Sequence, residues 1–125
     1  MILDSNALSA FADGDQNLLR VIGNEPVLVV PVIVLGEYLY GIYQSRFRVR
    51  YQRWLDANLS LFDLLVVGPE TARRYAELRR ELKTTGTPIP SNDAWIASLA
   101  REHRLPVVTR DNHFQAVRGL RLPTW

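Results

Sequence analysis

Residues 1–8 read Met-Ile-Leu-Asp-Ser-Asn-Ala-Leu, where a short apolar run ends on an acid and passes directly into a stretch able to begin a helix. The run does not alternate polar with apolar residues, so we expect a strand buried on both faces. Similar runs rich in β-branched residues follow at 27–30, 64–67 and 106–109, with a weaker one at 120–122. Strands of this kind are typical of a parallel sheet covered by helices.

Helical patterns separate these runs. The predicted helices begin at Ser5 or Asn6, at Asp13 or Asp15, at Pro31, near Arg46, at Pro69, and at Ser91 or Asn92. In the helix from Pro69, the residues expected to face inward are Ala72, Tyr75, Leu78 and Leu82. This order of elements predicts an α/β fold of three layers, α/β/α, with a central, mostly parallel sheet of four to five strands.

Length and composition exclude several classes of protein. The 125 residues fit one domain, 1–125, and 47% hydrophobic with 22% charged residues excludes disorder, collagen and a coiled-coil rod. There is no cysteine, which excludes disulfides, thiolate zinc sites and cysteine nucleophiles. Neither GxxxxGKS/T nor GxGxxG occurs, which argues against a nucleotide-dependent kinase or dehydrogenase. The apolar stretch 27–43 is too interrupted for a membrane span and no leader is visible, so we expect a cytoplasmic protein.

Four acids stand where apolar residues or an ordinary surface would be expected. Asp4 ends the first predicted strand, and Asp111 follows the strand at 106–109. Asp93 lies in the first turn of a predicted helix, and Glu37 lies inside the most apolar helix. Ligands of parallel α/β sheets bind at the carboxyl ends of strands, which is where Asp4 and Asp111 fall. Taken singly, the three aspartates could be helix caps, and Glu37 could pair with a buried arginine.

Together the four acids predict a cluster that repels itself unless a cation is present. Mg²⁺ and Mn²⁺ are hard divalent ions that match all-oxygen ligands. One or two such ions can activate water in the hydrolysis of a phosphodiester. The two histidines, His103 and His113, are too few for a His-rich metal site.

Four segments of the chain resemble PIN-domain ribonucleases of the VapC toxin type, in the order and at the spacing of that family. They are Ile-Leu-Asp-Ser-Asn-Ala-Leu at 2–8, Glu-Tyr-Leu-Tyr-Gly-Ile at 37–42, Pro-Ser-Asn-Asp-Ala-Trp-Ile-Ala at 90–97, and Val-Thr-Arg-Asp-Asn-His-Phe at 108–114. The resemblance covers essentially the whole chain. It implies a PIN-like fold and a Mg²⁺-dependent endoribonuclease, in which Mn²⁺ can replace Mg²⁺.

The resemblance also implies roles for individual residues. Asp4 and Asp93 would be the principal metal ligands, and Glu37 and Asp111 would complete the pocket directly or through water. Asn6 matches a polar position that orients ligands or water. The implied partners are an RNA substrate, a VapB-type antitoxin and a second copy of the chain in a homodimer, with no membrane.

Three alternatives stay open at this point. A phosphohydrolase with Asp4 as nucleophile would need a second aspartate two residues later, where Asn6 stands. A stand-alone PIN ribonuclease would have no antitoxin. A non-catalytic RNA-binding or scaffold domain would carry a vestigial pocket, and the intact acidic set argues against it.

A stripe of aromatic residues runs along 40–54 with arginines beside it. The stripe consists of Tyr40, Tyr43, Phe47, Tyr51 and Trp54, flanked by Arg46, Arg50 and Arg53. Its helical spacing fits core packing, a protein interface or a surface that stacks bases. Because the resembling toxins bind an antitoxin and dimerise, we favour the interface.

Overall fold

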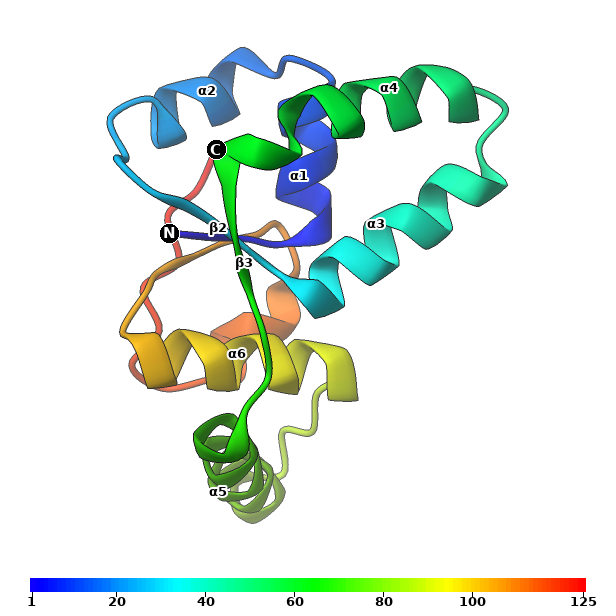
Figure 1. Cartoon of the computed structure of the whole chain (residues 1–125). Coiled ribbons are helices and arrows are strands. Elements are labelled where there is room, and N and C mark those ends of the chain that lie inside the picture. The colour runs from blue at the N-terminus through cyan, green and yellow to red at the C-terminus, as the bar shows by residue number, and fades with distance from the viewer.

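The computed structural model describes residues 1–125 and shows a four-stranded parallel sheet between two layers of helices (Figure 1). The strands are β1 (Ile2–Leu3), β2 (Leu28–Pro31), β3 (Phe62–Leu65) and β4 (Val107–Val108). The helices are α1 (Ser5–Ala12), α2 (Gln16–Ile22), α3 (Val32–Gln44), α4 (Arg48–Asn58), α5 (Pro69–Thr85) and α6 (Ser91–His103), with short 3₁₀ helices η1 (Leu59–Leu61) and η2 (Asn112–Ala116). No helix is both long and apolar enough to cross a membrane. The predicted three-layer α/β fold is therefore confirmed.

The strand order β3-β2-β1-β4 puts β1 in the middle of the sheet, with Ile2 in register with Val29 on one side and Val107 on the other. α1, α2 and α4 lie on one side of the sheet, and α6 lies on the other with α5 packed outside it (Figure 1). Every connection is a crossover through helices, as parallel strands require. All four carboxyl ends consequently lie along one edge of the sheet.

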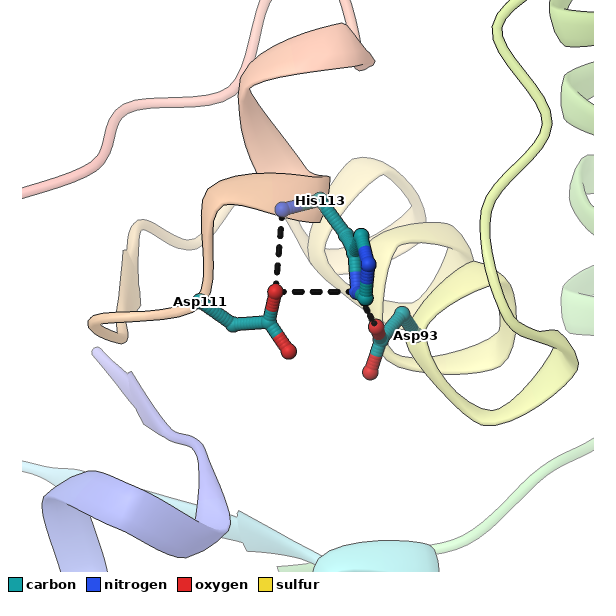
Figure 2. A group of neighbouring side chains, drawn as sticks. All are labelled: Asp93, Asp111 and His113. Atoms are coloured by element: carbon teal, nitrogen blue, oxygen red, sulfur yellow. Dashed lines mark hydrogen bonds and ion pairs between the residues drawn. The ribbon is translucent and has the colours of Figure 1, made fainter.

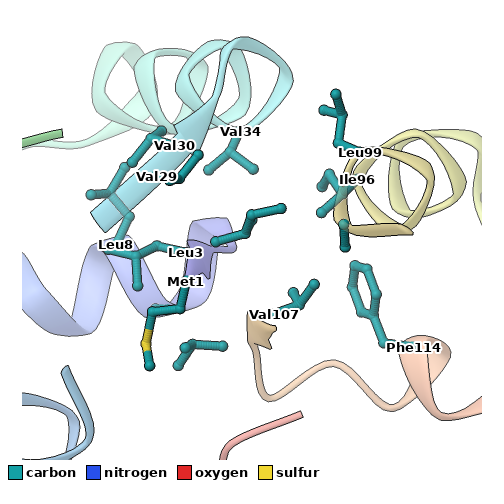
Figure 3. Close-up of a cluster of buried hydrophobic side chains, with 14 of the residues drawn as sticks. Met1, Leu3, Leu8, Val29, Val30, Val34, Ile96, Leu99, Val107 and Phe114 are labelled. Carbon is teal, nitrogen blue, oxygen red and sulfur yellow. The ribbon is translucent and has the colours of Figure 1, made fainter. Parts of the chain in front are cut away.

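The core is formed by one cluster of 25 buried apolar residues. Figure 3 shows Leu3, Val30 and Val107 of the sheet beside Leu99 of α6 and Phe114 of η2, which fill the space between the layers. Burying one such aliphatic or aromatic side chain contributes about 1.5–3 kcal/mol to folding. Because β1 and β4 carry only apolar side chains, both strands can be fully enclosed by helices.

Two strand predictions were wrong in detail. The third strand is β3 at Phe62–Leu65 rather than 64–67, and it is not buried on both faces, since Asp63 and Leu64 are exposed. β3 is an edge strand that pairs only with β2, but β4 lies at the other edge and is buried, so the difference is in how the faces of the two strands are covered. No fifth strand forms at 120–122, where one hydrogen bond from the Val107 N–H to the Arg121 carbonyl, 3.0 Å long, takes the place of a ladder.

The helix ends largely follow the local sequence signals. Asp15 caps α2 by accepting hydrogen bonds from the N–H groups of Asn17 and Leu18 at 2.9 and 3.2 Å. Gly86 ends α5 in the left-handed conformation that glycine adopts without strain, with φ of 69°. On α5 the inward face differs from expectation at one place, because Thr71 is buried and Ala72 is exposed.

Candidate active site

Asp4 lies at the carboxyl end of the central strand β1, and only 4% of it is exposed. Its Oδ1 accepts a hydrogen bond of 2.8 Å from the N–H of Ser5, at the start of α1. Its Oδ2 accepts one of 2.7 Å from the hydroxyl of Thr109. Burial raises the pKa of Asp4, and the two hydrogen bonds lower it in part. Asp4 is thus both the N-cap of α1 and a carboxylate held at the sheet edge.

Thr109 connects three of the polar groups at this edge. Besides donating to Asp4, its hydroxyl accepts hydrogen bonds from the N–H of Asp111 at 3.0 Å and from Nδ2 of Asn6 at 3.4 Å. Asn6 in turn accepts a hydrogen bond of 3.2 Å from the N–H of Arg110 through Oδ1. Asn6 therefore holds the segment after β4 against the start of α1. Sequence reasoning missed the role of Thr109, although a hydroxyl at the end of a buried strand was the available signal.

Asp93 and Asp111 meet at His113, as Figure 2 shows. Nδ1 of His113 lies 2.9 Å from Oδ2 of Asp93 and 2.9 Å from Oδ1 of Asp111. The main-chain N–H of His113 also donates a hydrogen bond of 2.9 Å to Oδ1 of Asp111. Asp111 thereby caps η2, which is the role as a helix cap that the sequence left open for it. Ligand-type atoms of the three residues all lie within 4.8 Å of one another. His113 is therefore a local hydrogen-bond partner of both aspartates, and its imidazole belongs to the same group of ligand-type atoms.

Asp93 stands in the first turn of α6, where the helix dipole favours a negative charge. Only 9% of it is exposed, and burial raises its pKa above the ordinary value. The hydrogen bond with His113 opposes that shift, while the charges of Asp111 and Asp4 add to it. The pKa of His113 is raised in return, first by this hydrogen bond to Asp93.

Glu37 completes the pocket from α3. It is half-buried, and its Oε1 is enclosed without a hydrogen-bond partner, so no arginine pairs with that oxygen. Burial is the main cause that raises the pKa of Glu37, followed by the charges of Asp4, Asp93 and Asp111. The other three acids thus act on Glu37 through their charges, whereas the group of ligand-type atoms within 4.8 Å of one another contains only Asp93, Asp111 and His113.

A hollow of about 460 Å³ extends from this acidic pocket between α1, α3 and α4. Its lining includes Asn6, Glu37, Tyr38 and Tyr51. The Tyr38 hydroxyl is buried without a partner, and burial raises its pKa to about 12. Of the four acids, only Glu37 lines this hollow, together with Asp13 of the α1 C-cap.

The aromatic stripe at 40–54 divides into a packed part and an exposed part. Trp54 packs edge-on against Phe11 and Tyr38, with ring centres 5.6 and 6.4 Å apart, so it belongs to the core side. Tyr40 and Tyr43 are 64% and 66% exposed. Core packing therefore holds for Trp54. Tyr40 and Tyr43 form an exposed surface that a partner can contact.

Comparison with known proteins places the chain in a family. Residues 1–120 match the PIN domain. The chain is 30% identical to Ribonuclease VapC2 of Rickettsia felis over 129 aligned positions, covering 99% of this chain and 96% of that protein. It is also 30% identical to Ribonuclease VapC5 of Mycobacterium tuberculosis, with 94% and 87% covered.

Solved structures agree with this match. The structure of VapBC2 from Rickettsia felis, bound to a DNA fragment from its promoter, contains a chain with a TM-score of 0.85 and 29% identity, covering 99% of this chain and 97% of that one. DNA-bound VapBC from Salmonella typhimurium contains a chain with a TM-score of 0.86 and 26% identity, and the match covers 99% of this chain and 96% of that one. The fold, the clustered acids and these matches together define a nuclease of the PIN class. The chain belongs to the PIN-domain family and, within it, is of the VapC ribonuclease type.

Proposed function

We propose that this VapC-type chain hydrolyses RNA phosphodiester bonds in a divalent-cation-dependent reaction at the pocket of Asp4, Glu37, Asp93 and Asp111. The observation that carries the proposal is the environment of Glu37. Its enclosed Oε1 has no partner, and the other three acids all raise its pKa. Enclosed carboxylates that repel one another are stabilised by a cation between them.

The donor set fits a hard divalent ion. Four carboxylates and one imidazole offer mainly oxygen, which suits Mg²⁺, with Mn²⁺ as a substitute. Asp4 and Asp93 would be the principal ligands, with Glu37 and Asp111 binding directly or through water. A bound ion would lower the pKa of a coordinated water and neutralise charge on the phosphate.

The other polar residues would keep the carboxylates in position. Thr109 fixes one oxygen of Asp4 at 2.7 Å, and Asn6 ties Thr109 to the main chain of Arg110. His113 lies at 2.9 Å from both Asp93 and Asp111 and so orients that pair. Such outer partners typically change metal affinity or activity about 10- to 100-fold when they are removed.

The proposed role is that of a toxin whose protein partner is a VapB-type antitoxin. The Rickettsia and Salmonella relatives are found in VapBC complexes. The exposed part of the aromatic stripe supports a protein contact, because Tyr43 and Phe47 are 66% and 48% exposed and the guanidinium of Arg46 lies 5.0 Å from the centre of the Phe47 ring. Exposed aromatics beside arginine are the composition that interfaces favour.

A homodimer is the second expected assembly. The outer strand β3 and the residues after it expose Leu64, Val66 and Val67, an apolar edge that a second copy could cover. Sedimentation of the purified chain, without antitoxin, measures this directly. If the protein sediments as a monomer at all concentrations, the chain does not form the proposed homodimer.

The test of the proposed reaction is cleavage of an end-labelled RNA by the purified chain. Mg²⁺ should support cleavage at internal positions, EDTA should abolish it, and Mn²⁺ should restore it. Asp4→Asn, with the same volume and one charge fewer, should remove activity while keeping the α1 cap. Equal cleavage in EDTA and in Mg²⁺ would show that no divalent cation is needed.

A further inference from the structure

A second hollow, of about 430 Å³, lies at the end of the molecule opposite the acids. Its lining residues come from the C-terminal end of α6, from α5 and from the segment 118–121. Its arginines are Arg74, Arg101, Arg104, Arg118 and Arg121. They face only two acids, Glu77 and Glu81. Arg74 also pairs with Glu70, outside the hollow, at 3.2 Å, so the five arginines exceed Glu70, Glu77 and Glu81 by two charges, which equals the formal net charge of the whole chain, +2.

Two of these arginines hold the walls of the hollow together. Arg101 of α6 donates a hydrogen bond of 2.9 Å to the carbonyl of Arg118, and Arg121 donates one of 3.2 Å to the carbonyl of Arg104. Arg101 also pairs with Glu81 of α5 at 2.8 Å, which neutralises that acid. The end of α6 donates a hydrogen bond to the segment 118–121 and accepts one from it, and these two bonds hold the walls of the hollow together without a ligand.

Three of the five arginines have no acidic partner, although one of them, Arg121, also makes the wall hydrogen bond described above. Arg104, Arg118 and Arg121 are all exposed, and none of them takes part in an ion pair. The dipole at the C-terminus of α6 accounts for a cation at Arg104. It does not account for Arg118 and Arg121, which lie in no helix.

Arg104 also carries a backbone cost. It is the only residue other than glycine with a positive φ, 55°, at the C-cap of α6. Glycine or asparagine is the usual residue at such a position, because other side chains are strained there. From this position Arg104 contributes to the lining of the hollow.

We propose that this arginine hollow binds the phosphate backbone of the RNA that the acidic pocket cleaves. The proposal rests on the proposed function for the identity of the ligand. Arginine forks bind phosphate oxygens in pairs, and a rigid set of them selects a polyanion without reading its sequence. An acidic protein segment has weaker support, because the hollow has few apolar side chains to anchor a peptide.

The separation of the two sites sets the length of RNA that can reach both. Asp93 is in the first turn of α6 and Arg104 follows its last residue, so 11 residues of helix rise separate them, roughly 16 Å at about 1.5 Å each. A stacked strand that rises about 3.4 Å per nucleotide covers this in roughly five nucleotides. An RNA of three nucleotides therefore reaches only the acids, whereas one of about twelve can occupy both sites.

The test compares Arg104→Gln, Arg118→Gln and the double variant with Arg20→Gln. Arg20 is exposed on α2 and unpaired, so its replacement removes the same charge from another face. Arg101 and Arg121 stay unchanged because they hold the walls. Affinity for a labelled 12-nucleotide RNA is measured in EDTA, where binding is read without cleavage, and the cleavage rate of a trinucleotide is measured in Mg²⁺.

The double variant should bind the 12-mer about five- to tenfold more weakly, and the slope of log affinity against log salt should fall by roughly 1.4, about 0.7 for each lost phosphate contact. It should cleave the trinucleotide at the wild-type rate. The proposal would be overturned if the double variant bound the 12-mer with the affinity and the salt slope of the wild type. It would also be overturned if the double variant lost no more affinity than Arg20→Gln does. If the wild type cuts no RNA yet the 12-mer still depends on these arginines, the proposed reaction fails and the binding site stands.

Discussion

The hydroxyl of Thr109 donates a hydrogen bond of 2.7 Å to Oδ2 of Asp4, and so joins the ends of the neighbouring strands β4 and β1. The hydroxyl oxygen of Thr109 also accepts a hydrogen bond from the N–H of Asp111, which begins the turn that carries the other half of the acidic pocket. One buried side chain therefore sets the position of two of the four acids relative to each other.

Replacing Thr109 by valine, which has nearly the same shape, should separate these roles from packing. The buried carboxylate of Asp4 would lose a donor, so we expect a loss of about 1–3 kcal/mol in the free energy of unfolding. Cleavage of RNA should fall at least about tenfold because the carboxylates are less fixed. Thr109→Ser keeps the hydroxyl and should retain most of the activity. Equal activity of the valine and serine variants would show that the hydroxyl is not needed for positioning.

Glu37→Gln should preserve the fold and strongly reduce cleavage. The amide has the volume of the carboxylate but lacks the charge that faces Asp4, Asp93 and Asp111. Removing that charge relieves repulsion, so the melting temperature in EDTA should be equal to that of the wild type or higher. Cleavage should fall about 10- to 100-fold. A variant that cuts RNA at the wild-type rate would make Glu37 a structural residue only.

Without a divalent cation, stability should decrease as the pH rises above about 4, the ordinary pKa of these carboxyl groups. Burial raises the pKa of Asp4, Glu37 and Asp93 in the folded chain. The folded chain then holds these protons more tightly than the unfolded chain. The resulting stabilisation is complete below the unfolded pKa values, about 4, and is lost as the pH rises through the folded values.

Urea unfolding in EDTA at several pH values measures this effect. Asp93→Asn is the control, because it removes one of the three groups and the partner that raises the pKa of His113. The wild type should lose more stability with rising pH than the variant does. Parallel curves for the two proteins would show that Asp93 does not titrate abnormally.

The exposed part of the aromatic stripe should contribute to binding of the antitoxin rather than to catalysis. Phe47→Ala and Arg50→Glu change exposed residues, whereas Trp54 packs against Phe11 and would unsettle the core. Each variant should weaken association with the antitoxin, measured by titration calorimetry, while RNA cleavage by the free protein stays near the wild-type rate. Reduced cleavage with unchanged association would move this surface to the RNA site.

The sequence was sufficient to predict the layers of the fold and the acids, for identifiable reasons. Asp4 directly ends a buried strand, and Asp93 lies in the first turn of a helix in which half of the other residues are buried, so each stands out in its local context. The contacts of Thr109 and His113 could not be predicted in this way. The Thr109–Asp4 bond spans 105 positions and the His113–Asp93 contact spans 20, so both depend on strand order and turn geometry.

The exposure of β3 was also beyond local reasoning. Its sequence reads Phe-Asp-Leu-Leu, and whether Leu64 is covered depends on which elements pack against that face of the sheet, which the local sequence does not determine. The split of the aromatic stripe has the same origin. Trp54 packs against Phe11 of α1 and Tyr38 of α3, and the Phe11 contact joins elements far apart in the chain.

The central claim, that the four acids form a divalent-cation site, is tested most directly by melting curves across a Mn²⁺ titration of the wild type and Asp93→Asn. The wild type should show a saturable rise in stability, about 2.7 kcal/mol at a Mn²⁺ concentration roughly a hundred times the dissociation constant. Asp93→Asn should start at the same stability or higher, because one repelling charge is gone, and should gain much less from Mn²⁺. A wild type without any saturable shift, or a variant whose shift equals that of the wild type, would contradict the account.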